Sequence, residues 1–179
     1  MASPISCLSI LVIPLLVTSL FYQVSNADQA LLERICRNST DHDFCMASLL
    51  SNERSINSSL VALEIISIEL NVDVVEVAVN RIPDVNKTLT DPVDKTRLKN
   101  CENDIGDAHE NMFRAGDGAN LFNYDKVQTT LTAALLKIGE CANQYESSPK
   151  RQSPLSDLTF KMGRLIDISF VIVNYILGV

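Results

Sequence analysis

The chain has 179 residues and a formal net charge of −7, and 46% of its residues are hydrophobic. This length suits one domain with a substantial buried core. An acidic chain is not attracted to nucleic acid or to anionic lipid surfaces, so we expect neither as a partner. A protein partner, preferably a basic one, fits the charge better.

The first 27 residues have the composition of a secretory signal peptide. They contain an apolar run from Leu8 to Leu20 and no Asp, Glu, Lys or Arg, and Ser25-Asn26-Ala27 has the small-x-small form of a cleavage site. The run is short for an uncleaved membrane anchor. We therefore expect cleavage after Ala27, secretion, and a mature domain of residues 28–179.

Cysteines and glycosylation sequons agree with secretion. One of the five cysteines leaves with the signal peptide, and an even number in the mature chain indicates two disulfides among Cys36, Cys45, Cys101 and Cys141. Three Asn-x-Ser/Thr sequons are predicted glycosylation sites; they lie at Asn38, Asn57 and Asn86.

Apolar residues recur at steps of three and four in four stretches of the mature chain. The stretches cover residues 58–82, 98–119, 124–145 and 155–176. In the first stretch the apolar positions are Val61, Ile65, Ile68, Val72, Val75, Val79 and Ile82. Such spacing places the apolar residues on one side of a helix. Four such helices bury their apolar sides together, which predicts an all-α, antiparallel up-down four-helix bundle over residues 58–179.

Proline, glycine and capping residues separate these predicted helices. We expect Pro83 to end the first helix. Asp91-Pro92 and Ser153-Pro154 each fit an N-cap followed by proline at the first helical position. Gly116-Asp117-Gly118 and Asn123 predict a turn between the second and third helices.

Residues 28–50 precede the bundle and predict a helical hairpin. Two short helices, at 29–36 and 43–50, flank a turn at residues 38–41. Helices this short are marginally stable alone, so the hairpin needs a constraint.

The positions of the cysteines select one of the three possible disulfide connectivities. In an antiparallel hairpin, residues equidistant from the turn lie at the same height. The midpoint between Cys101 and Cys141 falls in the predicted turn at 116–123, and the midpoint between Cys36 and Cys45 falls in the turn at 38–41. Facing positions at the same height can bring two Cα atoms into the distance range that a disulfide requires. We therefore predict the bridges 36–45 and 101–141.

These features together resemble the plant invertase inhibitor and pectin methylesterase inhibitor family. The resemblance extends over the whole mature chain. Beyond the cysteine frame it rests on short segments, namely Leu32-Glu-Arg-Ile-Cys36, Met46-Ala-Ser-Leu-Leu50, Leu98-Lys-Asn-Cys101, Thr132-Ala-Ala-Leu135 and Ser153-Pro-Leu155. The chain departs from the family at Glu140, where threonine is usual, and at Asn143, where aspartate is common.

The resemblance implies a secreted apoplastic protein that inhibits a cell-wall carbohydrate enzyme by one-to-one docking over its cleft. Either a pectin methylesterase or a cell-wall or vacuolar acid invertase is the implied target. By analogy with invertase inhibitors, the start of the third bundle helix enters the cleft; Tyr124, Asp125 and Lys126 stand where those inhibitors often carry Pro-Lys-Phe. By analogy with pectin methylesterase inhibitors, polar faces of the bundle cover the cleft.

The residues themselves argue against catalysis. The mature chain has two histidines, His42 and His109, and no nucleophile or metal motif. We interpret Asp41-His42-Asp43 as a solvated turn and His109 as a helix-surface residue. We therefore predict no enzyme activity, cofactor or metal. The apolar stretch 165–179 contains Asp167 and Asn174 and predicts a core helix rather than a membrane anchor. The alternative function is a secreted helical module that binds a small ligand or a partner protein without inhibiting it, as pollen-type relatives suggest.

Overall fold

A computed structural model describes residues 29–179, so the predicted signal peptide lies outside the described residues. A short helix covers residues 29–36. It is followed by α2 (His42–Leu50), the 3-10 helix η1 (Glu53–Asn57) and four long helices, α3 (Leu60–Thr88), α4 (Pro92–Asn120), α5 (Tyr124–Asn143) and α6 (Ser156–Leu177). Residues 29–179 contain no strand.

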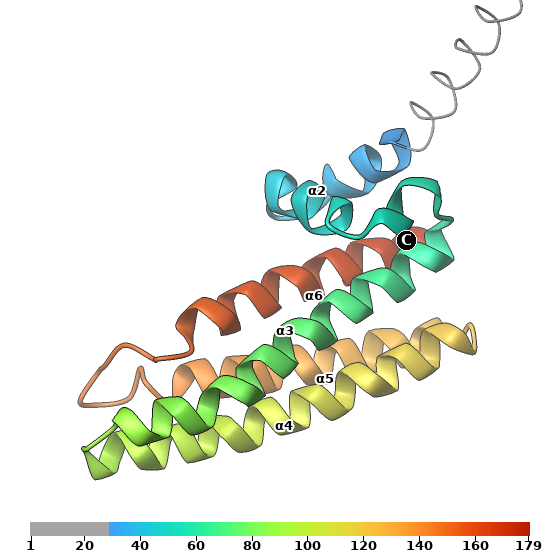
Figure 1. Cartoon of the computed structure of the whole chain (residues 1–179). Helices are drawn as coiled ribbons and strands as arrows, with labels where there is room; N and C mark the ends of the chain where they lie inside the picture. Colours follow the sequence, from blue (N-terminus) through green and yellow to red (C-terminus); the bar gives the residue numbers. More distant parts are fainter. Residues whose placement is uncertain (1–28) are drawn as a thin grey trace, which may run out of the picture.

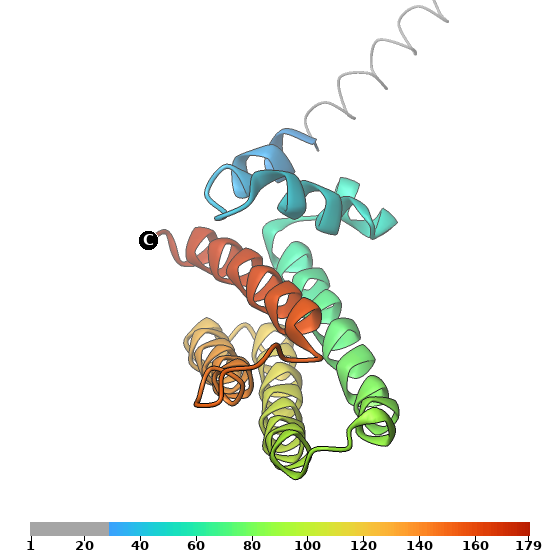
Figure 2. The same cartoon turned by 90° about the vertical axis from the view of Figure 1, so that its left-hand side faces the viewer.

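The four long helices run alternately up and down, and each packs against two others (Figure 1). α3 contacts α4 and α6, and α5 contacts the same two helices. Figure 2 shows this closed arrangement from another side. The predicted fold, an antiparallel four-helix bundle with an N-terminal helical hairpin and two disulfides, is confirmed.

Three of the four predicted apolar stripes are the faces that the helices bury. In α5 and α6 the stripe is buried except at its outer ends, Tyr124 and Ile176, which are half-buried. In α4 every position of the stripe is buried, namely Leu98, Cys101, Ile105, Ala108, Met112, Ala115 and Ala119. Regular apolar spacing therefore gave the correct orientation of these helices.

The fourth helix, α3, is rotated from its predicted orientation. Val79 of the predicted stripe is 40% exposed, whereas the polar Glu64, Ser67 and Asn71 lie in the core at 0–1% exposure. The full buried face comprises Leu63, Glu64, Ile66, Ser67, Ile68, Asn71, Val74, Val75, Ala78 and Ile82. Because three core positions carry polar residues, apolar spacing alone does not indicate this face.

Polar groups join α3 to α6 inside the core. The hydroxyl oxygens of Ser67 and Ser169 are 2.9 Å apart, and Nδ2 of Asn71 donates to Ser169 Oγ at 3.2 Å. Neither carboxylate oxygen of Glu64 has a hydrogen-bond partner within residues 29–179. Burial raises the pKa of Glu64 well above its ordinary value of 4.5. The core therefore favours a neutral carboxylic acid at this position.

Two predicted helix boundaries are wrong. Pro83 lies inside α3, which continues to Thr88. Pro83 is exposed, so its turn faces solvent, where water can replace the missing backbone hydrogen bond. α6 begins at Ser156 rather than after Ser153; Ser153 Oγ instead accepts from the N–H of Leu155, at 3.2 Å, in the turn before the helix.

The start of α4 agrees with its predicted cap. The side chain of Asp91 accepts from the N–H of Val93 at 2.8 Å, and Pro92 occupies the first helical position. The proline needs no hydrogen-bond partner there, so this sequence starts a helix cleanly.

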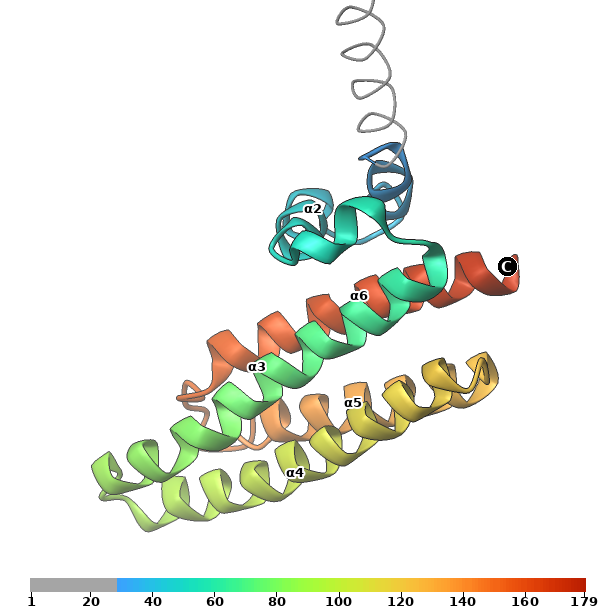
Figure 3. The same ribbon diagram turned by 45° about the vertical axis from the view of Figure 1, so that its right-hand side comes forward.

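The helical hairpin lies on the α3/α6 side of the bundle, near the start of α3 and the end of α6 (Figures 1 and 3). The disulfide between Cys36 and Cys45 closes it, with Cα atoms 5.4 Å apart. The second disulfide joins Cys101 of α4 to Cys141 of α5 inside the core. One bridge thus holds the hairpin and the other holds the central pair of bundle helices.

We expect the substitution Glu64→Gln to flatten the dependence of stability on pH. The folded-state pKa of Glu64 lies above 4.5, so its contribution to stability is complete below pH 4.5 and is lost as the pH rises through the folded-state value. Glutamine keeps the shape and carries no charge. In urea unfolding at about pH 8 the variant should gain on the order of 1–3 kcal/mol over the wild type, and near pH 4 the two should match.

Asp73→Asn, at an exposed position of the same helix, is the matched control and should leave the pH dependence unchanged. If Glu64→Gln kept the wild-type pH dependence, the carboxyl group would not be held neutral in the core.

Candidate functional site

The turn between α4 and α5 presents two exposed apolar side chains at one end of the bundle. Leu121 is 73% exposed and Phe122 is 68% exposed. The φ angle of Phe122 is 55°, in the left-handed region that favours glycine. The N–H of Asn123 donates to the carbonyl of Gly118 at 2.9 Å and that of Phe122 to the carbonyl of Ala119 at 3.1 Å. These are the hydrogen bonds of a Schellman C-cap, with phenylalanine in the position where glycine is usual.

The beginning of α5 packs closely against the last turn of α4. A Cβ atom on Gly118 would lie 3.1 Å from Val127 Cγ2 and 3.2 Å from the carbonyl oxygen of Asn123, so any larger residue would push the start of α5 away from α4. Asn123 then caps α5 by accepting from the N–H of Lys126 at 3.1 Å. The predicted turn is therefore shorter than expected, because Gly116 and Gly118 both lie inside α4.

The three residues predicted to contact a target have different environments. Asp125 is exposed and Lys126 is half-buried. Tyr124 packs against the core, and its hydroxyl is buried without a hydrogen-bond partner within residues 29–179. Burial raises the pKa of Tyr124 above its ordinary value of 10.0. Tyr124 is thus a structural residue of the bundle end, and Leu121 and Phe122 are the accessible apolar side chains that the sequence analysis missed.

A second candidate surface lies between α5 and α6. An apolar hollow of about 600 Å³ is bounded by residues of both helices and by Thr40 of the hairpin turn. Two large apolar side chains of its lining are exposed, Leu135 at 41% and Phe160 at 67%. A volume of this size and an apolar lining are typical of surfaces that receive a ligand or an anchoring side chain.

Two glycines keep this hollow open. Gly139 of α5 and Gly163 of α6 line it, and a Cβ atom at either position would meet nothing within 4 Å. Glycine inside a helix destabilises it by roughly 0.5–1 kcal/mol relative to alanine. No close packing requires glycine at these two positions, so the missing side chains affect only the space of the hollow.

Arg164 connects the hollow to the hairpin. Its guanidinium group lies 3.8 Å from the ring centroid of Phe44 and 5.4 Å from that of Phe160, and it forms an ion pair with Asp41. Asp167, one turn further along α6, accepts from the backbone N–H of Thr40 at 2.9 Å. The hairpin turn is therefore a fixed wall of the hollow.

Glu140, where the family usually has threonine, belongs to a charged cluster between α4 and α5. Nζ of Lys137 lies 2.9 Å from Glu140, 3.3 Å from Asp107 and 3.8 Å from Asp104. The hydrogen bonds to Glu140 and Asp107 raise the pKa of Lys137 to about 12. This part of the surface is acidic overall and would suit a basic partner.

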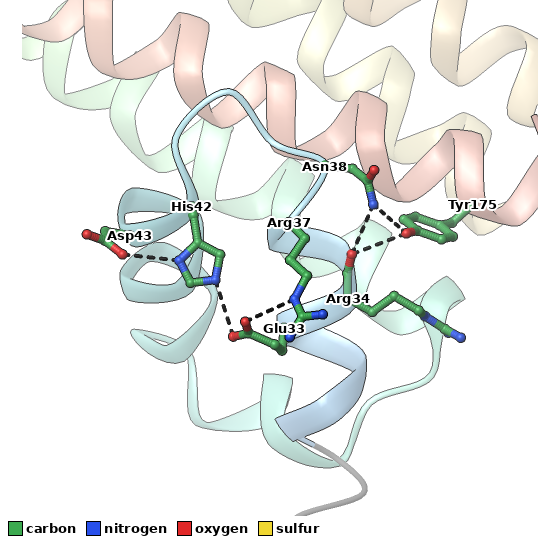
Figure 4. Close-up of polar contacts among 7 residues, drawn as sticks. All are labelled: Glu33, Arg34, Arg37, Asn38, His42, Asp43 and Tyr175. Carbon is green, nitrogen blue, oxygen red and sulfur yellow. Dashed lines mark hydrogen bonds and ion pairs between the residues drawn. The ribbon is translucent and has the colours of Figure 1, made fainter.

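His42 links the two helices of the hairpin through their carboxylates (Figure 4). Nε2 of His42 lies 3.2 Å from Glu33 and Nδ1 lies 3.1 Å from Asp43. The hydrogen bonds to Asp43 and Glu33 raise the pKa of His42 above 6.5. The pKa of Glu33 is lowered by its hydrogen bonds to Arg37 and His42. His42 therefore bridges the two helices of the hairpin from a solvent-accessible position beside the N-cap of α2, which agrees with the solvated turn expected from the sequence.

The predicted glycosylation positions are all exposed, namely Asn38, Asn57 and Asn86. Asn38 lies in the hairpin turn, Asn57 ends η1 and Asn86 lies in the last turns of α3. Glycosylation of each remains a prediction.

Residues 29–179 contain no group of three or more His, Cys, Asp or Glu side chains arranged to hold a metal ion. In the same part of the chain, no helix combines the length and the apolar character that crossing a membrane requires.

Comparisons with known proteins agree with this geometry. A family model described as plant invertase/pectin methylesterase inhibitor matches residues 30–172. The pectinesterase inhibitor of Actinidia deliciosa is 26% identical over 171 residues, which cover 95% of this chain and 92% of that protein.

Two solved structures share the fold. A mutant form of a pectin methylesterase inhibitor from Arabidopsis has a TM-score of 0.69 at 19% identity, covering 78% of this chain and 93% of that one. A pectin methylesterase inhibitor from Arabidopsis thaliana has a TM-score of 0.61 at 17% identity, covering 81% and 95%.

We expect Phe122→Gly to stabilise the protein, because glycine adopts the positive φ angle of this position without strain. The lost side chain is mostly exposed, so little burial is sacrificed. The gain in the free energy of unfolding should be about 0.4–1 kcal/mol in urea titration. Leu121→Gly, at the neighbouring position with φ of −96°, should give no gain. Equal effects of the two substitutions would contradict this interpretation.

We expect the imidazole of His42 to titrate above pH 6.5, because protonation lets both ring nitrogens donate to carboxylates. The contribution of the protonated His42 imidazole to hairpin stability is complete below pH 6.5 and is lost as the pH rises through the folded-state pKa of His42. An NMR titration of the ring protons measures this value. Glu33→Gln should lower it, and the distant Glu76→Gln should not. A value at or below 6.5 in the wild type would show that the contacts do not form in solution.

Proposed function

Because the chain belongs to the plant invertase/pectin methylesterase inhibitor family, we propose that it is a secreted inhibitor of a cell-wall pectin methylesterase. It binds the enzyme one-to-one over the active-site cleft and catalyses no reaction itself. The names of the related proteins, all pectinesterase or pectin methylesterase inhibitors, support this target over acid invertase.

In this proposal, the surface around the hollow between α5 and α6 contacts the enzyme. The observation that supports it most directly is the open apolar hollow with exposed Leu135 and Phe160 at its edge. Exposed aromatic and aliphatic side chains around a preformed hollow are the usual anchors of a protein interface. The resemblance to pectin methylesterase inhibitors implied that polar faces of the bundle cover the enzyme; in this proposal the exposed Leu135 and Phe160 add apolar anchors to such a face.

Rigidity makes the bundle suitable for inhibition. The central helices α4 and α5 are joined by the bridge between Cys101 and Cys141, and the hairpin wall of the hollow is closed by its own bridge. A surface that is already ordered loses little conformational entropy when it binds. Inhibition then follows from exclusion of the substrate from the covered cleft.

The α4–α5 turn defines the competing mode of docking. In that mode the exposed Leu121 and Phe122, together with Asp125 and Lys126, enter the cleft of an acid invertase. The half-buried Tyr124 contributes to this contact only by holding the turn in place.

Both targets and both surfaces are tested by one set of titrations. Purified protein should inhibit a plant pectin methylesterase near pH 5 with a submicromolar inhibition constant and should inhibit an acid invertase much more weakly. The double substitution Leu135→Ser/Phe160→Ser should raise the constant about tenfold or more, the effect of losing about 1.4 kcal/mol of binding free energy. Phe122→Ser should change it by less than about threefold.

Val77→Ser is a matched control, because Val77 is 53% exposed on α3, away from both surfaces. Stronger inhibition of invertase, abolished by Phe122→Ser, would replace the proposal with the competing mode. Absence of inhibition of both enzymes would favour the alternative of a non-inhibitory binding module.

A further inference from the structure

Asn38 differs from the other sequon asparagines in the use of its side-chain amide. Its Nδ2 donates to the hydroxyl of Tyr175 at 2.5 Å and to the carbonyl of Arg34 at 3.1 Å (Figure 4). The Tyr175 hydroxyl in turn donates to the same carbonyl at 3.1 Å. An amide group has two N–H bonds, so both hydrogens of Asn38 are used: one ties the hairpin to Tyr175 at the end of α6, and the other holds the turn to Arg34 of the hairpin's first helix.

The rest of this sequon is also held by α6. Oδ2 of Asp167 accepts from Ser39 Oγ at 2.8 Å, from the backbone N–H of Thr40 at 2.9 Å and from Thr40 Oγ1 at 3.1 Å. The hydroxyl that defines the sequon is therefore engaged as well. All three residues of the sequon have polar contacts with a helix that lies more than 120 positions later in the sequence.

The asparagines of the other two sequons do not use their side-chain amides in this way. Within residues 29–179 the side-chain amides of Asn57 and Asn86 make no hydrogen bond that meets ordinary geometric criteria, and both residues are exposed. A sugar attached to either would therefore break no hydrogen bond of the side-chain amide within residues 29–179.

We propose that Asn38 is a structural amide that remains unglycosylated in the folded, secreted protein, and that glycans attach at Asn57 and Asn86. N-glycosylation replaces one Nδ2–H bond by a bond from Nδ2 to C1 of the sugar, while the proton is released and the lipid-linked diphosphate of the donor departs. The modified amide has one hydrogen left and cannot serve both Tyr175 and Arg34.

Lack of room for a sugar beside Asn38 is not the reason that we expect no glycan there. A hollow of about 350 Å³ lies beside Asn38, bounded by residues of the last turns of α6. A first sugar would fit near it, so the conflict lies in the number of hydrogen bonds and not in crowding. The inference requires passage through the secretory pathway but is independent of inhibitor activity, so it can fail while the proposed function holds.

Site-by-site occupancy is the first test. The full chain is secreted from a plant cell line, its glycans are removed by a glycosidase in heavy-oxygen water, and each released asparagine is identified by the mass of the resulting aspartate. We expect labelled aspartate at positions 57 and 86 and none at position 38. Occupancy of Asn38 comparable to that of the other two sites would overturn the proposal, and so would an unmodified chain.

The second test measures the structural role of the amide without any glycan. Unglycosylated protein refolded with both disulfides intact is compared with Asn38→Ala by hydrogen exchange. Peptides from residues 29–41 should exchange about fivefold faster in the variant, the factor that corresponds to about 1 kcal/mol. Tyr175→Phe should reproduce the effect in part, and Asn57→Ala and Asn86→Ala should not. Wild-type exchange rates in Asn38→Ala would show that the amide does not hold the hairpin.

Discussion

The structure depends on the contacts that α6 makes on two sides at once. Its inner face closes the bundle through apolar packing and through Ser169, which meets Ser67 and Asn71 of α3. Its outer face holds the hairpin through Asp167 and Tyr175. Short helices at residues 29–50 would be marginal alone. Because one helix serves both purposes, the hairpin wall, the hollow between α5 and α6, and the bundle core are fixed relative to one another.

Most of the fold could be predicted from the sequence because most core positions are apolar. The stripes of α4, α5 and α6 repeat so regularly that they indicate the orientation of each helix, and the two bridges fit the same register. α3 was the exception. Periodicity counts Glu64 and Asn71 as surface residues, whereas packing against α6 places them inside. A buried polar group of this kind depends on tertiary neighbours that the local sequence does not specify.

The candidate surfaces were harder to predict than the fold. The family resemblance pointed to residues 124–126, yet the neighbouring Phe122 is the side chain that the turn exposes. Its left-handed backbone results from the hydrogen bonds that end α4, and phenylalanine gives no local signal of that conformation. The hollow between α5 and α6 is defined by residues from two helices and the hairpin turn, so no single stretch of sequence describes it.

The open space beside Gly139 and Gly163 has an evolutionary consequence. Neither glycine supports the interior, so a side chain introduced at either one would change the depth and chemistry of the hollow while the core stayed as it is. Mutational drift is ordinarily constrained by the risk of unfolding. Here two sites combine high tolerance with direct access to the surface that we propose for recognition. A lineage of such proteins could therefore diverge in partner preference by single steps, with the scaffold unchanged throughout.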